Sequence, residues 1–425
     1  MRLLYSALYY CLLPLLVLRM LWRSRRAPAY RQRLPERFGL FSPGLNLGRP
    51  AIWVHAVSVG EMQAAAPLVE SLLRQYPDYR LVVTTTTPTG SERVRALFGD
   101  RVFHVYLPWD LPDCMSRFLA RTRPALLLIM ETELWPNMLH YSRAAGCRIM
   151  LVNARMSERS ARGYRRVHSF TRSMLQQLNV AACQASIDGE RLLTLGLPQV
   201  ALALTGSIKF DLEIDEDLRC QAFSLRQACS GKGRPVVVAA STHAGEETLI
   251  LDAYRVVREA LGDCLLVLVP RHPERFDDVD ELCRTAGWQV ARRSLAGAPG
   301  ADDDILLGDT MGELLLLLGT ATVAVIGGSL VSRGGHNPLE AVAWGVPVVV
   351  GPDMTNFEEI CQRLRAAGAL VQLDRPVGLA PRLVELLGDP ARRRSMGAAG
   401  QQVLAGNRGA SNRVMALVAE QLAGH

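Results

Sequence analysis

Short apolar segments alternate with segments of helical periodicity along most of the chain. In the first half, the apolar segments are AIWVHAVS, RLVVTTT, VFHVYLP, ALLLIME, CRIMLVN and NVAACQA, each followed by a helical pattern such as EMQAAAPLVESLLRQY. Strands that alternate with helices form parallel sheets, because each crossover helix returns the chain to the same end of the sheet. The alternation therefore predicts an α/β fold with parallel sheets.

A polar interval from Asp211 to Arg234 divides the alternation into two series. The second series contains PVVVAAS, CLLVLVPR, DILLGD, TVAVIGGS, PVVVGP and ALVQL. A chain of 425 residues is too long for one core. We expect two Rossmann-like, doubly wound domains facing a cleft, one over 41–211 and one over 212–425, and the last helices could cross back.

Residues 1–40 are expected to form a membrane anchor with a basic collar. They contain eight arginines and one glutamate, a difference of +7 that equals the net charge of the whole chain. The arginines are Arg2, Arg19, Arg23, Arg25, Arg26, Arg31, Arg33 and Arg37. The remainder is neutral overall, which argues against a nucleic-acid-binding surface spread over the fold, and no nucleic-acid partner is expected.

An apolar run extends from Leu3 to Leu18 and is interrupted only by Ser6 and Pro14. It is shorter than the roughly 20 residues that span a bilayer, although residues 20–22 could extend it. A cleaved signal peptide is disfavoured, because most of the positive charge follows the run. An uncleaved signal anchor and an interfacial helix on anionic lipid both remain. Either one predicts a protein on the cytoplasmic face of a membrane.

The nine cysteines include no C-x-x-C pair and mostly lie inside apolar segments. This usage favours reduced core thiols and hence the cytoplasm.

Glu61 follows the first apolar segment, at the start of a helical pattern. Ser58 and Glu61 have the spacing of a capping box, so helix capping is one interpretation of this carboxylate. Catalysis is the other, because ligands of doubly wound sheets bind beyond the carboxyl ends of strands. The local sequence leaves both interpretations open.

Two further acids and one lysine follow other strand-like segments. Glu131 and Glu133 would share one face if their strand continued, although solvated loop acids would look the same. Lys209 lies close to the predicted domain boundary. Only two of the 48 basic residues are lysines, so a lysine retained against this bias suggests a specific role.

The most specific pattern of the second half is GGSLVSRGGHNPLEA, after a strand-like segment. Asn337 can cap a helix that has Pro338 at its first position and Glu340 as the capping-box acid. Gly334 and Gly335 would let a ligand approach the helix amides, which would make an anion site.

Two other segments are expected to lie beside this anion site. The residues Met311-Gly312-Glu313 are expected to begin a second helix, and Arg271 with His272 would supply a cation. Ordinary capping explains any one of these segments, whereas three at one sheet edge favour a binding site.

Metal and triphosphate sites are not expected. The histidines form no H-x-x-x-H or H-E-x-x-H pattern, and the acidic run 302–304 precedes a strand. The chain also lacks G-x-x-x-x-G-K-[ST], and no G-x-G-x-x-G follows the first strand.

The chain contains the motifs HAVSVGE, METELWPN, NARMSERS, TGSIKFD, PRHPERF, GDTMGEL, GGSL with GGHNPLEA, and GVPVVVGP. Taken together, these motifs resemble those of 3-deoxy-D-manno-octulosonic acid (Kdo) transferases. The resemblance covers nearly the whole chain. It implies a GT-B glycosyltransferase that moves Kdo from CMP-Kdo to the lipid A precursor in lipopolysaccharide assembly, with inversion.

The resemblance also implies residue roles. Glu61 matches the general base, and Glu131 and Lys209 match positions that stabilise the transition state. The positions implied for CMP-Kdo binding are Pro270, Arg271, His272, Met311, Gly312, Glu313, Asn337, Pro338, Leu339 and Glu340. A monophosphate donor can be neutralised by amides and an arginine, so no metal and no cofactor are expected.

Two expectations concern the acid and the acceptor. The helix N-terminus is expected to keep Glu61 ionised with a low pKa until substrate binding excludes water. Arg155, Arg159 and Arg162, together with the collar, could receive the lipid phosphates, although they could equally form a solvated helix face. A GT-B-type sugar-nucleotide epimerase is the alternative enzyme, and a membrane scaffold without activity is a third possibility.

Overall fold

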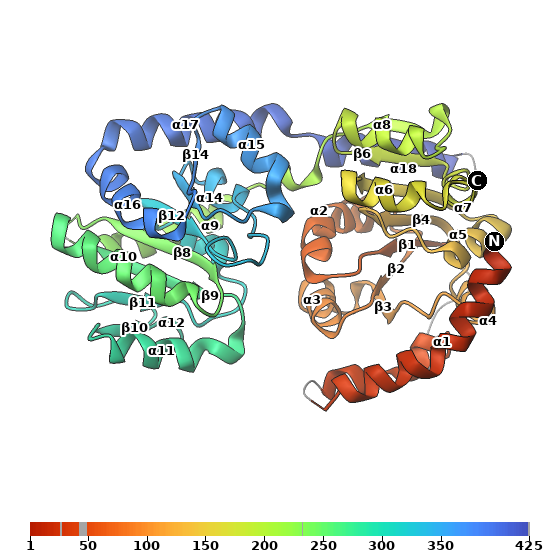
Figure 1. Ribbon diagram of the computed structural model, residues 1–425, viewed down its shortest axis with the longest axis horizontal. Helices are drawn as coiled ribbons and strands as arrows, with labels where there is room; N and C mark the ends of the chain where they lie inside the picture. The colour runs from red at the N-terminus through yellow and green to blue at the C-terminus, as the bar shows by residue number, and fades with distance from the viewer. Residues whose placement is uncertain (26–27, 42–48, 232, 424–425) are drawn as a thin grey trace. The chain divides into compact units, whose positions relative to one another are not determined.

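The computed structural model describes residues 1–25, 28–41, 49–231 and 233–423. The chain divides into two compact units (Figure 1). The first unit comprises 1–211 and 408–425, and the second comprises 212–407. The chain therefore leaves the first unit once and returns to it at its end.

The first unit is built on a seven-stranded parallel sheet with the order β3-β2-β1-β4-β5-β6-β7. The strands are β1 (Ala51–His55), β2 (Arg80–Thr85), β3 (Phe103–Tyr106), β4 (Pro124–Met130), β5 (Arg148–Ala154), β6 (Val180–Cys183) and β7 (Leu202–Leu204). The strand order reverses between β1 and β4, which makes their carboxyl ends the switch point where ligands of doubly wound sheets bind.

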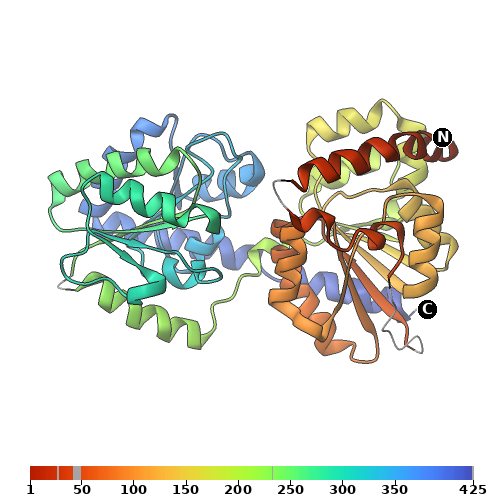
Figure 2. The same ribbon diagram turned by 90° about the horizontal axis from the view of Figure 1, so that it is seen from below.

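Helices cover both faces of this sheet (Figure 2). They are α2 (Val59–Gln75), α3 (Pro88–Phe98), α4 (Pro112–Thr122), α5 (Pro136–Ala144), α6 (Glu158–Arg165), α7 (His168–Leu175), α8 (Ser186–Thr194) and α18 (Ala410–Ala423). The first helix, α1 (Arg2–Arg23), packs outside this layer, against α5. Neighbouring residues of β1 point to opposite faces, so Trp53 packs in one core cluster while Ile52 and Val54 pack in the other. α18 adds Val414 and Val418 to the Ile52 cluster, beside the apolar side of α2.

The second unit repeats the architecture with the strand order β10-β11-β9-β8-β12-β13-β14. Its strands are β8 (Val236–Thr242), β9 (Leu265–Pro270), β10 (Val290–Arg292), β11 (Ile305–Leu307), β12 (Val323–Ile326), β13 (Val348–Val350) and β14 (Leu370–Gln372). Its helices are α9 (Glu216–Ser230), α10 (Glu246–Leu261), α11 (Phe276–Thr285), α12 (Arg293–Ala296), α13 (Leu314–Leu318), α14 (Leu339–Ala343), α15 (Glu358–Ala366), α16 (Leu379–Gly388) and α17 (Pro390–Asn407). Here the switch point lies between β8 and β12.

The first helix, α1, extends the expected apolar run at both ends. Residues 2–22 are long and apolar enough to cross a membrane, with a mean hydropathy of 1.7 over their most apolar stretch. Within the described residues, α1 is the one helix with this property. This length and composition fit a helix that spans a membrane as well as one that lies on its surface.

Candidate functional site

In the first unit, polar side chains gather at the carboxyl ends of β1 and β4. Glu61 lies in the first turn of α2, which follows β1, and Glu131 comes directly after β4. Lys209 belongs to a short 3-10 helix (Ile208–Phe210) after β7. The fold thus brings together three residues that are far apart in the sequence.

Glu61 closes the N-terminus of its own helix. The Ser58 side chain caps α2 and accepts the Glu61 backbone N–H at 3.4 Å. In return, one Glu61 carboxylate oxygen accepts the Val57 backbone N–H at 2.8 Å, and the other accepts the Ser58 hydroxyl at 2.9 Å. The Ser58 half of the predicted capping box is therefore present, whereas the Glu61 carboxylate accepts the N–H of Val57 instead of that of Ser58. These bonds hold the carboxylate in one orientation.

Burial changes the acidity of this carboxyl group. It raises the pKa of Glu61 to about 7, and the negative charges of Glu131 and Glu133 act in the same direction. The Val57 N–H and the Ser58 hydroxyl favour the anion but do not offset burial. The expectation of a low pKa before substrate binds is therefore wrong, because desolvation outweighs the helix N-terminus.

Glu131 and Lys209 form an ion pair. The Lys209 ammonium donates to Glu131 Oε1 at 2.9 Å, and both side chains are largely buried. Glu131 has a left-handed backbone with φ of 56°, which is strained for a residue with a side chain. The strand therefore ends at Met130 instead of continuing, and Glu133 turns to accept the Trp135 indole N–H at 3.0 Å. The shared strand face expected for the two glutamates is not formed.

Asn153 supports this site and was not singled out from the sequence. It lies near the end of β5, is fully buried, and also has a left-handed backbone, with φ of 56°. Its Oδ1 accepts the Ile208 backbone N–H at 3.2 Å, next to Lys209. The motif NARMSERS contained the signal, because an asparagine at the end of an apolar strand can adopt the left-handed conformation.

In the second unit, the glycine-rich segment follows β12 at the switch point. Asn337 Oδ1 accepts the Leu339 N–H at 3.2 Å, and α14 begins at Leu339 with Pro338 as its N-cap. The helix therefore starts one residue later than expected. It has only five residues, so it offers local N–H groups and little macrodipole.

The glycines of this segment serve protein packing as much as ligand approach. A Cβ on Gly334 would come within 2.4 Å of the Asn356 side chain, and a Cβ on Gly335 would come within 2.2 Å of Met354 Sδ. Both glycines also have positive φ. The expectation that they simply open the backbone to a ligand is therefore incomplete.

The other residues expected to bind CMP-Kdo lie at neighbouring strand ends. Pro270 is the last residue of β9, and Arg271 donates its backbone N–H to the Thr242 carbonyl at 2.9 Å. His272 is exposed beside it. Burial lowers the pKa of His243 to about 4 and that of His336 to about 3, and Arg271 contributes to both shifts. At neutral pH the positive charge here therefore comes from guanidinium groups and not from these two imidazoles.

The segment 311–313 precedes its helix instead of beginning it. α13 starts at Leu314, and Glu313 is its N-cap residue. The Glu313 carboxylate pairs with Arg293 at 2.8 Å and accepts the Thr310 hydroxyl, while Gly312 has a φ of 89° and Met311 is exposed. Glu313 is thus fixed by protein partners.

Glu246 is the second residue that sequence reasoning missed. It is fully buried in the first turn of α10, and its carboxylate accepts backbone N–H groups of His243, Gly328 and Leu330 at 2.7–2.9 Å. It therefore ties the end of β8 to the loop after β12. The signal was the segment STHAGEE, in which two acids follow a strand end.

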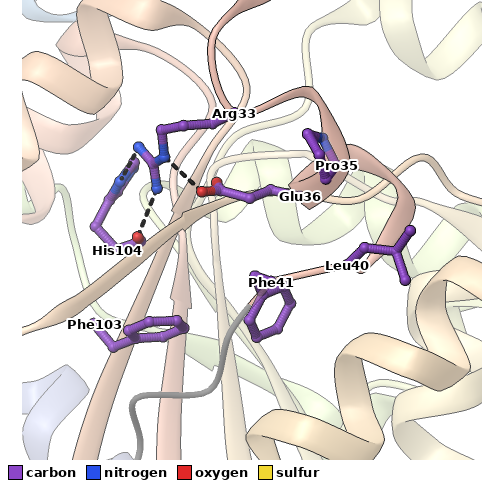
Figure 3. Close-up of a pocket in the computed structure, with 7 residues that line it drawn as sticks. All are labelled: Arg33, Pro35, Glu36, Leu40, Phe41, Phe103 and His104. Atoms are coloured by element: carbon purple, nitrogen blue, oxygen red, sulfur yellow. Dashed lines mark hydrogen bonds and ion pairs between the residues drawn. The ribbon is translucent and has the colours of Figure 1, made fainter.

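The basic collar is less uniform than expected. The Arg33 guanidinium pairs with Glu36 at 2.6 Å and donates to the His104 carbonyl, in the wall of a pocket of about 290 Å³ (Figure 3). Arg37 is buried and donates to the Thr86 carbonyl. These two arginines are structural, whereas Arg19, Arg25 and Arg31 are exposed. Arg26 lies outside the described residues.

The arginines expected to receive the acceptor differ in their contacts. Arg162 lies 3.8 Å from Glu158 at an exposed position of α6, and Arg159 is exposed on the same helix. Arg155 is partly buried. Within the described parts of the chain, no group of three or more metal-ligating side chains is close enough to hold an ion.

Comparisons with known proteins identify relatives over the whole length. A family model for 3-deoxy-D-manno-octulosonic-acid transferase matches residues 32–212. The 3-deoxy-D-manno-octulosonic acid transferase of Haemophilus influenzae is 42% identical over 418 residues, which cover 98% of each chain.

Solved structures share the fold at low sequence identity. A glycosyltransferase from Rickettsia africae matches with a TM-score of 0.57 at 10% identity, over 88% of this chain and 99% of that chain. The UDP-GlcNAc 2-epimerase from Neisseria meningitidis bound to UDP-GlcNAc also gives 0.57, at 14% identity, over 88% of this chain and all of that chain. The expected fold class, GT-B with two Rossmann-like domains, is confirmed, and these two likenesses show the fold alone.

Proposed function

The chain belongs to the Kdo transferase family, and from this premise we propose that it transfers Kdo from CMP-Kdo to the lipid A precursor. The cytoplasmic side of the inner membrane as the place of transfer is part of the same proposal. One structural observation carries the mechanism: the Glu61 carboxyl group, with a pKa of about 7, lies at the switch point with the Glu131–Lys209 pair. A base that titrates near the working pH is the kind that proton transfer requires.

In the proposed reaction, Glu61 accepts the proton of the acceptor hydroxyl while that oxygen attacks the anomeric carbon of Kdo. The bond between this carbon and the phosphate oxygen breaks, and CMP leaves with the bonding electrons. A single displacement inverts the configuration at the carbon. The capping hydrogen bonds hold Glu61 in one orientation, which supports its role as a positioned base.

Lys209 is proposed to stabilise negative charge during this step. Kdo carries a carboxylate, and the departing phosphate gains charge as its bond to the sugar breaks. Glu131 holds the ammonium group at 2.9 Å, and Asn153 fixes the adjacent backbone. The strained backbone of Glu131 supports this role, because such strain persists at functional sites.

The second unit is proposed to bind the donor through Arg271, the loop before α14 and the residues before α13. A single phosphate can be balanced by a guanidinium and backbone N–H groups, so the proposed reaction needs no divalent ion.

The direct test is a transfer assay with the purified full-length chain, CMP-Kdo and the lipid A precursor in detergent. We expect a product heavier than the acceptor by at least one Kdo residue, with equal rates in the presence and absence of a chelator. Mass spectrometry of the lipid gives the number of sugars added. Absence of product would overturn the assignment, and loss of activity with the chelator would overturn the metal-free mechanism alone.

A further inference from the structure

The first helix has two different faces along its whole length. One face lies against the first unit and contains Arg2, Ser6, Tyr9, Leu13 and Met20, which recur at helical spacing. Ser6 is 5% exposed and Met20 is 8% exposed, so this contact extends over nearly the entire helix. Figure 2 shows α1, in dark red, running along the side of the first unit.

The opposite face is apolar and exposed. Leu4 is 70% exposed, Leu15 62%, Leu18 63% and Trp22 63%, and Cys11 lies on the same side. The helix contains no acidic residue. Such a continuous exposed apolar stripe is unfavourable in water and indicates a partner that covers it.

Polar contacts fix the helix to the first unit. The Arg2 guanidinium donates to Asn137 Oδ1 at 3.1 Å, and the Asn137 side-chain amide donates to Ser6 Oγ at 3.0 Å. The buried Asn137 also donates its backbone N–H to the Asp110 carboxylate at 3.0 Å. If α1 left this position, the Asn137 side chain would lose its partners Arg2 and Ser6 and keep only its bond to the Asp110 carbonyl.

A spanning orientation conflicts with these contacts. A helix that crosses a bilayer is surrounded by hydrocarbon along its length, whereas one side of α1 packs against the first unit from Arg2 to Met20. To span while docked, α1 would have to carry the polar surface of that unit into the bilayer. A helix lying in the membrane surface avoids this cost, because only its exposed face enters the lipid.

We propose that α1 lies in the plane of the membrane, docked on the first unit along one face and immersed in the acyl chains of an anionic bilayer along the other. Charge complementarity selects this occupant. Arg19, near the C-terminal end of α1, and Arg25 and Arg31, which follow it, are exposed and can contact anionic head groups.

This placement orients the candidate site relative to the lipid. Asp110 and Asn137 follow the carboxyl ends of β3 and β4, and Glu131 follows β4 at the same edge of the sheet. The bilayer surface would therefore run beside the edge that carries the proposed base. That a lipid acceptor could reach the base from the bilayer rests on the proposed function, whereas the orientation of α1 does not.

A depth measurement tests the proposal. Leu4, Cys11 and Leu18 are exposed and seven residues apart, so they share one face of the helix. Three proteins are prepared, each with a single bimane label, at L4C, at native Cys11 or at L18C. All three carry C220A, which removes the other exposed cysteine. The labelled proteins are bound to vesicles of phosphatidylcholine with one third phosphatidylglycerol. The variants at positions 4 and 18 also carry C11A. Quenching by lipids brominated at shallow or deep positions reports the depth of each label.

We expect the three labels to lie at equal, shallow depth. A spanning helix would separate positions 4 and 18 by roughly 21 Å along the membrane normal and place Cys11 deepest, which would overturn the proposal. Vesicle-bound protein without quenching, or bimane pairs that contact each other, would overturn it in favour of a protein partner or a second copy. None of these readouts depends on sugar transfer, so they separate this proposal from the proposed function.

Charge variants provide the second measurement. Replacing Arg19, Arg25 or Arg31 by glutamine should weaken binding to the anionic vesicles about fivefold for each residue and leave binding to pure phosphatidylcholine unchanged. R101Q is the matched control, because Arg101 is exposed but pairs with Glu70. Equal effects on both vesicle types would contradict the role of head-group charge.

Discussion

At the scale of the residue, Glu61 shows that capping and catalysis are compatible roles. The capping box could be predicted from its spacing, because it depends on four consecutive residues. The raised pKa could not, because the burial and the charges of Glu131 and Glu133 come from a segment about 70 residues away. Lys209 stood out through composition, but its partner depends on the unusual backbone of Glu131, which the sequence does not reveal.

The pKa of Glu61 predicts a pH dependence of the reaction. The proposed base acts only when ionised, so kcat/KM should fall tenfold per pH unit below about pH 7. E61Q should lower kcat by about 100- to 10,000-fold and remove this acidic limb, while glutamine keeps one of the two acceptor oxygens of the cap. Initial rates between pH 5 and 9 measure both effects. E70Q, at an exposed ion pair, is the control and should match the wild type.

The same shift predicts a stability difference. The pKa of Glu61 is about 7 in the folded chain and 4.5 as the ordinary value, so the folded state binds more protons between these values. Stability is therefore lost as the pH rises from 4.5 to 7, by about 3 kcal/mol in total. E61Q should unfold at a higher temperature than the wild type at pH 8 and at a similar temperature at pH 4.5. A pH-independent difference between the two would contradict the shift.

At the scale of the element, the central strands of both sheets were recognisable in the sequence. They are buried on both faces and so appear as continuous apolar runs. The sequence did not reveal β7 and β10, which are three-residue edge strands. Leu204 in β7 is largely exposed, so the hydrophobic pattern that identifies a buried strand is weak there.

The glycine-rich loop of the second unit shows the same limit. Its composition predicted a turn before a helix, and the structure has that turn. Its shape, however, depends on Glu246, whose carboxylate binds backbone N–H groups on both sides of the switch point. A carboxylate that fixes a distant loop leaves no periodic signal in the sequence.

Replacing Glu246 should therefore disturb donor binding. E246A leaves the buried N–H groups of Gly328 and Leu330 without an acceptor, at about 1–3 kcal/mol each, and also the partly buried N–H of His243. We expect a lower melting temperature for the second unit and at least a tenfold weaker affinity for CMP, measured by calorimetric titration where the variant is folded. E259Q, at an exposed position of the same helix, is the control. Unchanged CMP affinity in folded E246A would show that the loop does not bind the donor.

At the scale of the whole molecule, the two units are joined by two chain crossings. The first crossing follows Asp211 and the second precedes Arg408. The Asp211 carboxylate accepts the backbone N–H groups of Gly409 and Ser411, so it caps α18 and fixes both crossings at one place. Arg413 adds a bond from its Nε to the Thr205 carbonyl at 2.8 Å.

Removing residues 408–425 should destabilise the first unit specifically. Val414, Val418 and Leu422 are buried against its sheet, at about 1.5–3 kcal/mol for each side chain, which is comparable to the net stability of a domain. Limited proteolysis with mass spectrometry should show cleavage in the first unit and protection of 212–407. D211N should give a milder form of this pattern. D215N, which weakens the cap of α9, should act on the second unit instead.

The return of α18 also sets an order of events during synthesis. The second unit is continuous in sequence and can fold as soon as it has left the ribosome, whereas the first unit is the first to emerge and the last to be completed. Until residue 423 appears, the sheet face around Ile52 and Val54 lacks its covering helix. A nascent chain would therefore expose two apolar surfaces, this sheet face and the lipid-facing side of α1. Early contact of α1 with the membrane would cover one of them and so reduce aggregation.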